Sequence, residues 1–88
     1  MSYILDFTDK AKGDIEFFKK SGNKAVLKKI FTLLNEIIES PFVGTGKPEP
    51  LKYNLTGYWS RRINREHRLV YEVTEEIIII LSAKGHYE

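Results

Sequence analysis

Two periods of apolar residues divide the chain into a helical half and a strand-rich half. Residues 3–7 alternate briefly between apolar and polar side chains, which predicts a short strand. Thr8 or Asp9 can cap a following helix through a side-chain oxygen, and we expect this helix to run to about Ser21 and to end at Gly22. Its apolar face consists of Ala11, Ile15 and Phe18.

A second helix is predicted between Asn23, which can cap its start, and Pro41, which stops it. Its apolar stripe is wide enough to be buried against a sheet as well as against the first helix. The stripe consists of Val26, Leu27, Ile30, Phe31, Leu33, Leu34, Ile37 and Ile38.

The following residues 41–50 hold three prolines and two glycines, so we expect a loop without strand pairing. Loops of this kind often carry functional sites. Four strand-like runs come next, and short links between strands predict an antiparallel meander. The runs cover residues 51–55, 58–63, 68–74 and 77–84.

Residues 77–81 are apolar at every position, as expected for a strand that is covered on both faces or flanked on both edges. The strand at residues 3–7 is therefore expected to pair along its free edge. We see no internal repeat, and residues 1–88 are expected to form a single domain. The predicted fold class is α+β, with two N-terminal helices packed on one face of a mainly antiparallel sheet, in the order β-α-α-β-β-β-β.

Alternation within two runs predicts where their side chains point. Trp59 and Ile63 share one face of their run, and Arg62 lies on the other. In the next run the apolar set faces away from Arg68. If both apolar sets face the helices, the turn between the runs spans three or five residues, and Arg62 lies opposite Arg68 on the open face of the sheet.

Two like charges directly opposite each other destabilise a sheet, but an anion bound between them offsets this repulsion. Guanidinium groups match the geometry of phosphate, so the pair of Arg62 and Arg68 predicts a phosphate site. The alternative is that both arginines extend into water, or that one of them pairs with Glu66 or Glu72.

Composition restricts the environment of the protein. The chain has no cysteine, so it can form neither a disulfide nor a thiolate metal site. It shows neither a signal-peptide pattern nor a run of about 18 apolar residues, so we expect no membrane partner and a cytoplasmic location.

Net charge is only +2, but residues 47–68 carry six basic and two acidic side chains, a local balance of +4. Aromatic residues lie in the same stretch, and this mixture suits single-stranded nucleic acid, whose phosphates bind cations and whose bases stack on rings. The alternative is a solvated sheet edge. The charged residues are Lys47, Lys52, Arg61, Arg62, Arg65 and Arg68 against Glu49 and Glu66.

The same stretch resembles the central signature of the YoeB branch of the RelE toxin superfamily. The matching segments are Gly44-Thr45-Gly46-Lys47-Pro48-Glu49-Pro50-Leu51-Lys52, Asn54-Leu55-Thr56-Gly57-Tyr58-Trp59-Ser60-Arg61-Arg62-Ile63, Glu66-His67-Arg68-Leu69-Val70-Tyr71 and the terminal Gly85-His86-Tyr87. The resemblance covers the second half of the chain densely, whereas the helices agree in pattern, length and order.

The resemblance implies the toxin of a toxin-antitoxin pair, a ribosome-dependent endonuclease that cleaves messenger RNA and is silenced by an antitoxin of YefM type. A homodimer is compatible with it. By position, the resemblance implies a general base at Glu49, phosphate contacts at Arg62 and Arg68, and a general acid at His86. The residues grouped beside them for RNA or phosphate binding are Lys47, Lys52 and Tyr87.

These residue types suit RNA cleavage, because RNA carries its own nucleophile, the 2′-hydroxyl. The reaction needs a base, an acid and cations at the phosphate, and it calls for no metal and no cofactor. Imidazole titrates near ~6.5 and suits the acid, whereas a carboxylate is a weak base whose contribution rests on placement.

Each residue also has a structural explanation. Glu49 can be an exposed loop carboxylate, His86 a surface residue, and His67 a turn residue that bonds its own backbone; Trp59 and Tyr71 favour the core. Two other functions remain open: a relative that binds RNA or the ribosome without cutting, and a gyrase-poison-like protein that acts by protein binding.

Overall fold

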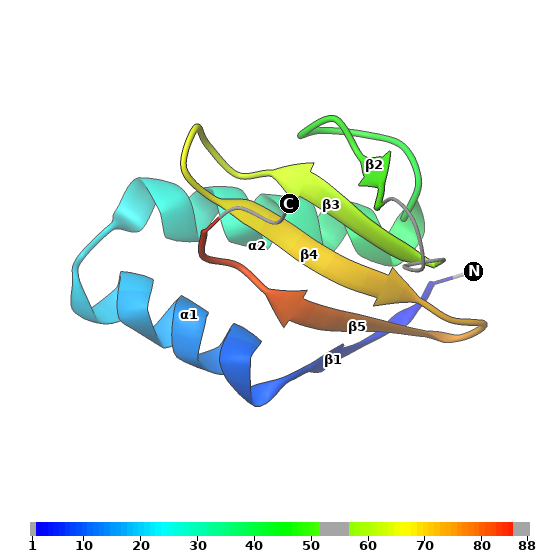
Figure 1. Ribbon diagram of the computed structural model, residues 1–88, viewed down its shortest axis with the longest axis horizontal. Helices are drawn as coiled ribbons and strands as arrows, with labels where there is room; N and C mark the ends of the chain where they lie inside the picture. Colours follow the sequence, from blue (N-terminus) through cyan, green and yellow to red (C-terminus); the bar gives the residue numbers. More distant parts are fainter. Residues whose placement is uncertain (1, 52–56, 86–88) are drawn as a thin grey trace.

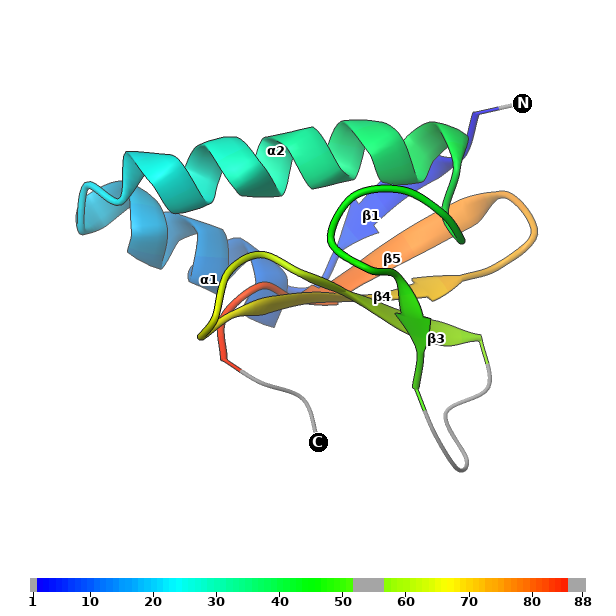
Figure 2. The ribbon, with the colours of Figure 1, turned by 90° about the horizontal axis from the view of Figure 1, so that it is seen from above.

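A computed structural model describes residues 2–51 and 57–85 of the chain. Its elements are β1 (Ile4–Phe7), α1 (Asp9–Lys20), α2 (Lys24–Glu39), β2 (Glu49–Pro50), β3 (Tyr58–Arg62), β4 (Arg68–Val73) and β5 (Ile77–Ser82). The five strands form one sheet in the order β1-β5-β4-β3-β2 (Figure 1). β1 is parallel to β5, and the other neighbours are antiparallel. Both helices lie on the same side of this sheet (Figure 2), which confirms the predicted α+β class and element order.

Local signals set the ends of both helices. The side chain of Thr8 accepts a hydrogen bond from the backbone N–H of Ala11 (3.1 Å), and that of Asn23 accepts one from Val26 (3.2 Å). Gly22 turns the chain between the helices with a φ of 73°, in the left-handed region that glycine adopts without steric cost. No helix in the described parts of the chain is long and apolar enough to span a membrane.

The core lies between the helices and the face of the sheet that they cover. β5 is flanked by β1 and β4, which confirms the second of the two arrangements expected for its apolar run. Burial of one Ile or Leu side chain contributes about 1.5–3 kcal/mol, so the shared apolar layer drives the packing. Its fully buried members include Phe18, Ile30, Leu33, Ile37, Leu69, Tyr71, Ile78 and Ile80.

The pairing of β3 with β4 follows the register predicted from alternation. Arg62 lies opposite Arg68, so the turn spans the five residues 63–67. Asn64 builds this turn, because its side-chain oxygen accepts hydrogen bonds from the backbone N–H groups of Glu66 and His67 (both 2.8 Å).

The prediction of an unpaired loop over residues 41–50, followed by a strand over residues 51–55, was wrong in its boundary. Strand pairing occurs inside the proline-rich segment, where Glu49 lies opposite Ser60 and Pro50 opposite Trp59. The backbone N–H of Leu51 donates to the carbonyl of Tyr58 (2.8 Å). Because successive N–H groups of a strand point to opposite sides, the nitrogen of Pro50 faces away from β3, where no N–H is needed for pairing. Leu51 itself lies outside the strand, and residues 52–55 lie outside the described residues.

Asp14 joins α1 to the end of β5. This carboxylate is 8% exposed, and one of its oxygens accepts hydrogen bonds from the backbone N–H groups of Ala83 (2.9 Å) and Lys84 (3.2 Å). The same oxygen also accepts a hydrogen bond from Lys10 (2.7 Å). Asp14 thus holds the segment through which the chain leaves the sheet.

We expect Asp14→Ala to lower the free energy of unfolding by about 1–3 kcal/mol, because the buried N–H of Ala83 loses its acceptor. Urea denaturation measures this change. Lys10→Ala is the control, since it removes only the mostly exposed partner of the same carboxylate and should cost no more than about 0.5 kcal/mol. Equal losses in the two variants would contradict this role of Asp14.

Candidate functional site

Glu49 and Arg68 meet on the open face of the sheet, the face away from the helices. An Oε1 atom of Glu49 lies 3.7 Å from Nη1 of Arg68, and the two side chains are 59% and 20% exposed. They come from β2 and β4, so both reach over β3. The residue of β3 opposite Glu49 is the small, buried Ser60, which leaves room for this contact. The structure thus brings together two of the residues proposed for chemistry.

Arg62 lies beside this pair. Its backbone N–H donates to Gly46 (2.7 Å) and that of Arg68 donates to Gly85 (3.0 Å), so the two opposed N–H groups point away from each other. In antiparallel sheets such a pair has Cα atoms about 4.5 Å apart, and its side chains lie close together. Arg62 is exposed and Arg68 is partly buried against the Glu49 carboxylate, rather than against Glu66 or Glu72.

Lys47 lies two residues before Glu49 and is exposed, with a φ of 51° in the left-handed region. Its position places a further positive charge next to the backbone contact between Gly46 and Arg62. The predicted residues Lys52, His86 and Tyr87 lie outside the described residues.

The last described residue, Gly85, is held on both sides of its backbone. Its N–H donates to Nδ1 of His67 (2.9 Å), and its carbonyl accepts from the N–H of Arg68. The expectation that His67 bonds its own backbone was wrong, because its acceptor atom is taken by a residue 18 positions away and its ring packs 5.0 Å from that of Phe18. Gly85 is thus tied to the start of β4.

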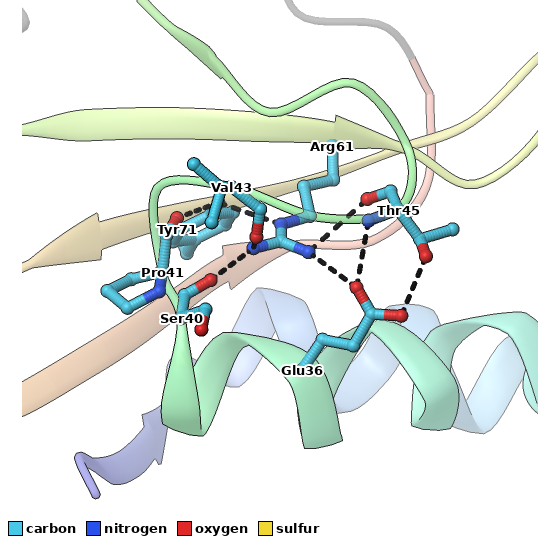
Figure 3. A network of polar contacts seen from close by, with 7 residues as sticks. All are labelled: Glu36, Ser40, Pro41, Val43, Thr45, Arg61 and Tyr71. Carbon is cyan, nitrogen blue, oxygen red and sulfur yellow. Dashed lines mark hydrogen bonds and ion pairs between the residues drawn. The ribbon is translucent and has the colours of Figure 1, made fainter. Parts of the chain in front are cut away.

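The role of Arg61 was not predicted from the sequence, where this residue was counted with the basic groups that suit nucleic acid. The side chain of Arg61 is fully buried on the helix side of the sheet (Figure 3). An arginine has five N–H donors, and here they make five hydrogen bonds. The acceptors are Tyr71 Oη (3.1 Å), Glu36 Oε1 (3.1 Å) and the carbonyls of Thr45 (3.3 Å), Ser40 (2.6 Å) and Val43 (2.8 Å).

Glu36 and Tyr71 complete this arginine clamp, which we define as Arg61, Glu36 and Tyr71. Glu36 accepts hydrogen bonds from the hydroxyl (2.7 Å) and the N–H (2.8 Å) of Thr45, and these bonds, with the Arg61 charge, lower its pKa below the ordinary value of 4.5. Tyr71 donates to the carbonyl of Pro41 (2.7 Å), and burial raises its pKa. The prediction that Tyr71 and Trp59 belong to the core is confirmed.

Glycine is required at two positions of the clamped loop. A Cβ atom at Gly44 would lie 2.6 Å from the Glu36 carboxylate and 2.9 Å from the Arg61 guanidinium. At Gly46, where φ is 86°, it would lie 2.8 Å from the backbone oxygen of Arg62, which cannot move aside. The glycines of the sequence signature therefore allow the close approach of loop, clamp and strand.

The open face can bind an anion and place a carboxylate beside it. Among the described residues, Arg62 and Arg68 supply positive charge on this face, and the carboxylate in contact with Arg68 is that of Glu49. No group of three or more His, Asp or Glu side chains within residues 2–51 and 57–85 is arranged to hold a metal ion.

The lowered pKa of Glu36 predicts a pH dependence of stability. The folded state favours the carboxylate, so this contribution is present above about pH 4.5 and is lost as the pH falls through the lower folded pKa. Urea denaturation should show that Glu36→Gln costs less stability at pH 3 than at pH 7. Thr45→Val, which removes the largest cause of the shift, should weaken this dependence. A stability difference that stays constant with pH would contradict it.

Comparison with known proteins identifies the family of the chain. The model of the YoeB-like toxin of bacterial type II toxin-antitoxin systems matches residues 7–87. The toxin YoeB of Synechocystis sp. is 49% identical over 84 residues, which are 96% of this chain and 96% of the relative.

Solved structures give the same result. The YoeB dimer from Staphylococcus aureus is 46% identical, covers 99% of this chain and 100% of its own, and superposes with a TM-score of 0.88. The heterotetrameric YoeB-YefM complex from the same organism is 46% identical, with the same coverage and a TM-score of 0.83. The signature around the clamped loop, the fold and these matches together show that the chain belongs to the YoeB-like toxins of bacterial type II toxin-antitoxin systems.

Proposed function

We propose that this toxin is an endoribonuclease that cleaves messenger RNA on the ribosome, in the cytoplasm, and thereby inhibits translation. The observation that carries the proposal is the contact of Glu49 with Arg68 at 3.7 Å, with Arg62 directly opposite Arg68. A carboxylate next to two guanidinium groups supplies a base beside a phosphate site. Cleavage of RNA needs the base and the cationic groups at the same phosphate.

In the proposed reaction the carboxylate of Glu49 takes the proton of the 2′-hydroxyl. The 2′-oxygen then forms a bond to the adjacent phosphorus, and the bond from phosphorus to the 5′-oxygen breaks. Arg68 and Arg62 stabilise the charge that develops on the phosphoryl oxygens, an effect for which loss of one donor typically costs about 100- to 1000-fold in rate. The products are a cyclic phosphate and a 5′-hydroxyl.

We assign the general acid, which protonates the departing 5′-oxygen, to His86. This residue follows Gly85, the residue whose backbone is bonded to both His67 and Arg68. Imidazole can carry the proton near neutral pH and donate it in the transition state. Lys47, Lys52 and Tyr87 are assigned to RNA and phosphate binding around this centre. The proposed base, acid and phosphate-binding groups are all side chains of this protein.

His86→Gln should slow cleavage strongly while leaving ribosome binding nearly unchanged, because the acid acts only in the chemical step. An RNA with sulfur in place of the 5′-oxygen has a leaving group that needs little protonation. This substrate should restore much of the rate of His86→Gln. Glu49→Gln should show no such rescue, because its role is at the nucleophile. Single-turnover cleavage at saturating ribosome measures both variants on both substrates.

Equal rescue of the two variants would remove His86 from the general-acid role. A wild-type protein that binds ribosomes without cutting RNA would instead favour the non-cleaving alternative.

We further propose that an acidic antitoxin of YefM type silences this toxin and that the toxin forms a homodimer, since the two S. aureus relatives are a YoeB dimer and a YoeB-YefM complex. The observation on this chain is the exposed positive charge of Arg62 on the open face and of Lys47 in the segment that leads into β2. An acidic, partly disordered segment can order as it covers this face.

The affinity of toxin for antitoxin should fall as salt is added. The double variant Lys47→Gln/Arg62→Gln should bind more weakly and with a smaller salt dependence, because two of the attractive charges are gone. Lys28→Gln, an exposed lysine of α2, is the control and should bind as the wild type does. Titration calorimetry at several salt concentrations measures these changes, and an affinity that is independent of salt would contradict the proposed contact.

A further inference from the structure

Arg61 is the largest of the fully buried side chains, and the proposed chemistry does not use it. Its charge is paired with the carboxylate of Glu36, which is 34% exposed. Replacement of a buried ion pair by apolar groups is often neutral or stabilising. Stability alone therefore does not explain a guanidinium at this position. Its contacts have another common feature, because they all end on the loop before β2 or on the two clamp residues that hold that loop.

The loop needs this support because β2 is only two residues long and lies at the edge of the sheet. A strand of this length makes few ladder hydrogen bonds, and one of its residues is a proline. The position of Glu49 along β3 is therefore set by the segment that leads into it. That segment is held at both ends, by Arg61 through the carbonyls of Ser40, Val43 and Thr45, and by the N–H of Arg62 through Gly46.

The connection between the clamped loop and Glu49 is short and conformationally restricted. Only Lys47 and Pro48 lie between Gly46 and Glu49. Lys47 has a φ of 51°, and the ring of Pro48 fixes the φ of Pro48 and restricts the conformation of Lys47. A shift of the loop at Gly46 is therefore passed on to Glu49. A displacement of about 1 Å of a reacting group can cost on the order of 100-fold in rate.

We propose that Arg61 is a positioning residue for Glu49. Its buried guanidinium fixes the path of residues 40–46 and thereby holds the Glu49 carboxylate against Arg68, at the phosphate site. Adjacent residues of β3 serve the same centre from opposite faces, since Arg61 holds the base in place from the helix side while Arg62 faces the phosphate on the open side. This inference rests on the proposed role of Glu49 as the base.

Arg61→Met tests the proposal, because methionine fills a similar space without hydrogen-bond donors. In single-turnover cleavage on ribosomes, we expect the maximal rate to fall on the order of 100-fold while the half-saturating concentration changes less than about 2-fold. In a Glu49→Gln background the same substitution should change the rate less than about 3-fold, because a base that is already absent cannot be misplaced.

Gly46→Ala provides a second variant that leaves the buried charge in place. Its Cβ would lie 2.8 Å from the backbone oxygen of Arg62, so the loop must shift. We expect a rate loss that also disappears in the Glu49→Gln background. Gly13→Ala is the matched control, since nothing lies within 4 Å of the added carbon in α1. This control should cleave at the wild-type rate.

The path of the loop can be followed without any activity measurement. Trp59, the single tryptophan, packs against Phe42 of the loop with ring centroids 5.0 Å apart. Release of the loop in Arg61→Met should shift the Trp59 emission, while far-UV circular dichroism shows that the fold is kept. Gly13→Ala should leave the emission unchanged.

The outcomes separate the two proposals. If Glu49→Gln cleaves at the wild-type rate, the proposed base is wrong and the positioning role fails with it. If Glu49→Gln is impaired but Arg61→Met and Gly46→Ala lower the rate by the same factor in both backgrounds, the positioning role alone is overturned. Loss of rate confined to the background with Glu49, accompanied by the shift in Trp59 emission, supports it.

Discussion

Five hydrogen bonds from one buried guanidinium join the α2 helix, the proline-rich loop and the sheet, and the arrangement of the open face depends on them. The segment of residues 41–50, with its three prolines, has few N–H groups with which to form a ladder, so its carbonyls need donors from elsewhere. Arg61 and Tyr71 supply these donors from the sheet. Because the loop is thereby fixed, a short edge strand can present a carboxylate at a defined place among arginines.

Much of the fold could be predicted because it follows from local rules. Residue type predicted the cap Asn23 and gave Thr8 as one of two candidates for the first cap, and the alternation of β3 and β4 was enough to predict that Arg62 faces Arg68. The pairing of β1 with β5, although not its parallel direction, was predicted from an apolar run expected to be covered on both faces or flanked on both edges. The family resemblance then added the proposed role of Glu49 as the base, which alternation alone could not assign.

The errors have a common cause, which is contact between residues far apart in the chain. Arg61 was counted with the basic groups that suit nucleic acid, although its place between Trp59 and Ile63 already put it on the apolar face; only the partner Glu36, 25 positions away, shows why burial is tolerated. The hydrogen bond of His67 to Gly85 is equally non-local. At β2, pairing depends on which side of the strand the proline nitrogen faces, and this is settled by the partner strand.

The position of β5 in the sheet has a consequence for the folding of the toxin during its synthesis. Within residues 2–51 and 57–85, β5 is the last element in chain order, yet it lies between β1 and β4 and supplies the edge to which β1 is paired. Pairings between such distant segments form late, because the chain must first close a long loop. Each described residue of the proposed centre, from Lys47 to Arg68, is synthesised before β5. A polypeptide interrupted before this strand would therefore contain these residues but lack both the strand that joins β1 to β4 and the buried Ile78 and Ile80 of the core, so an incomplete translation product of this chain is expected not to fold.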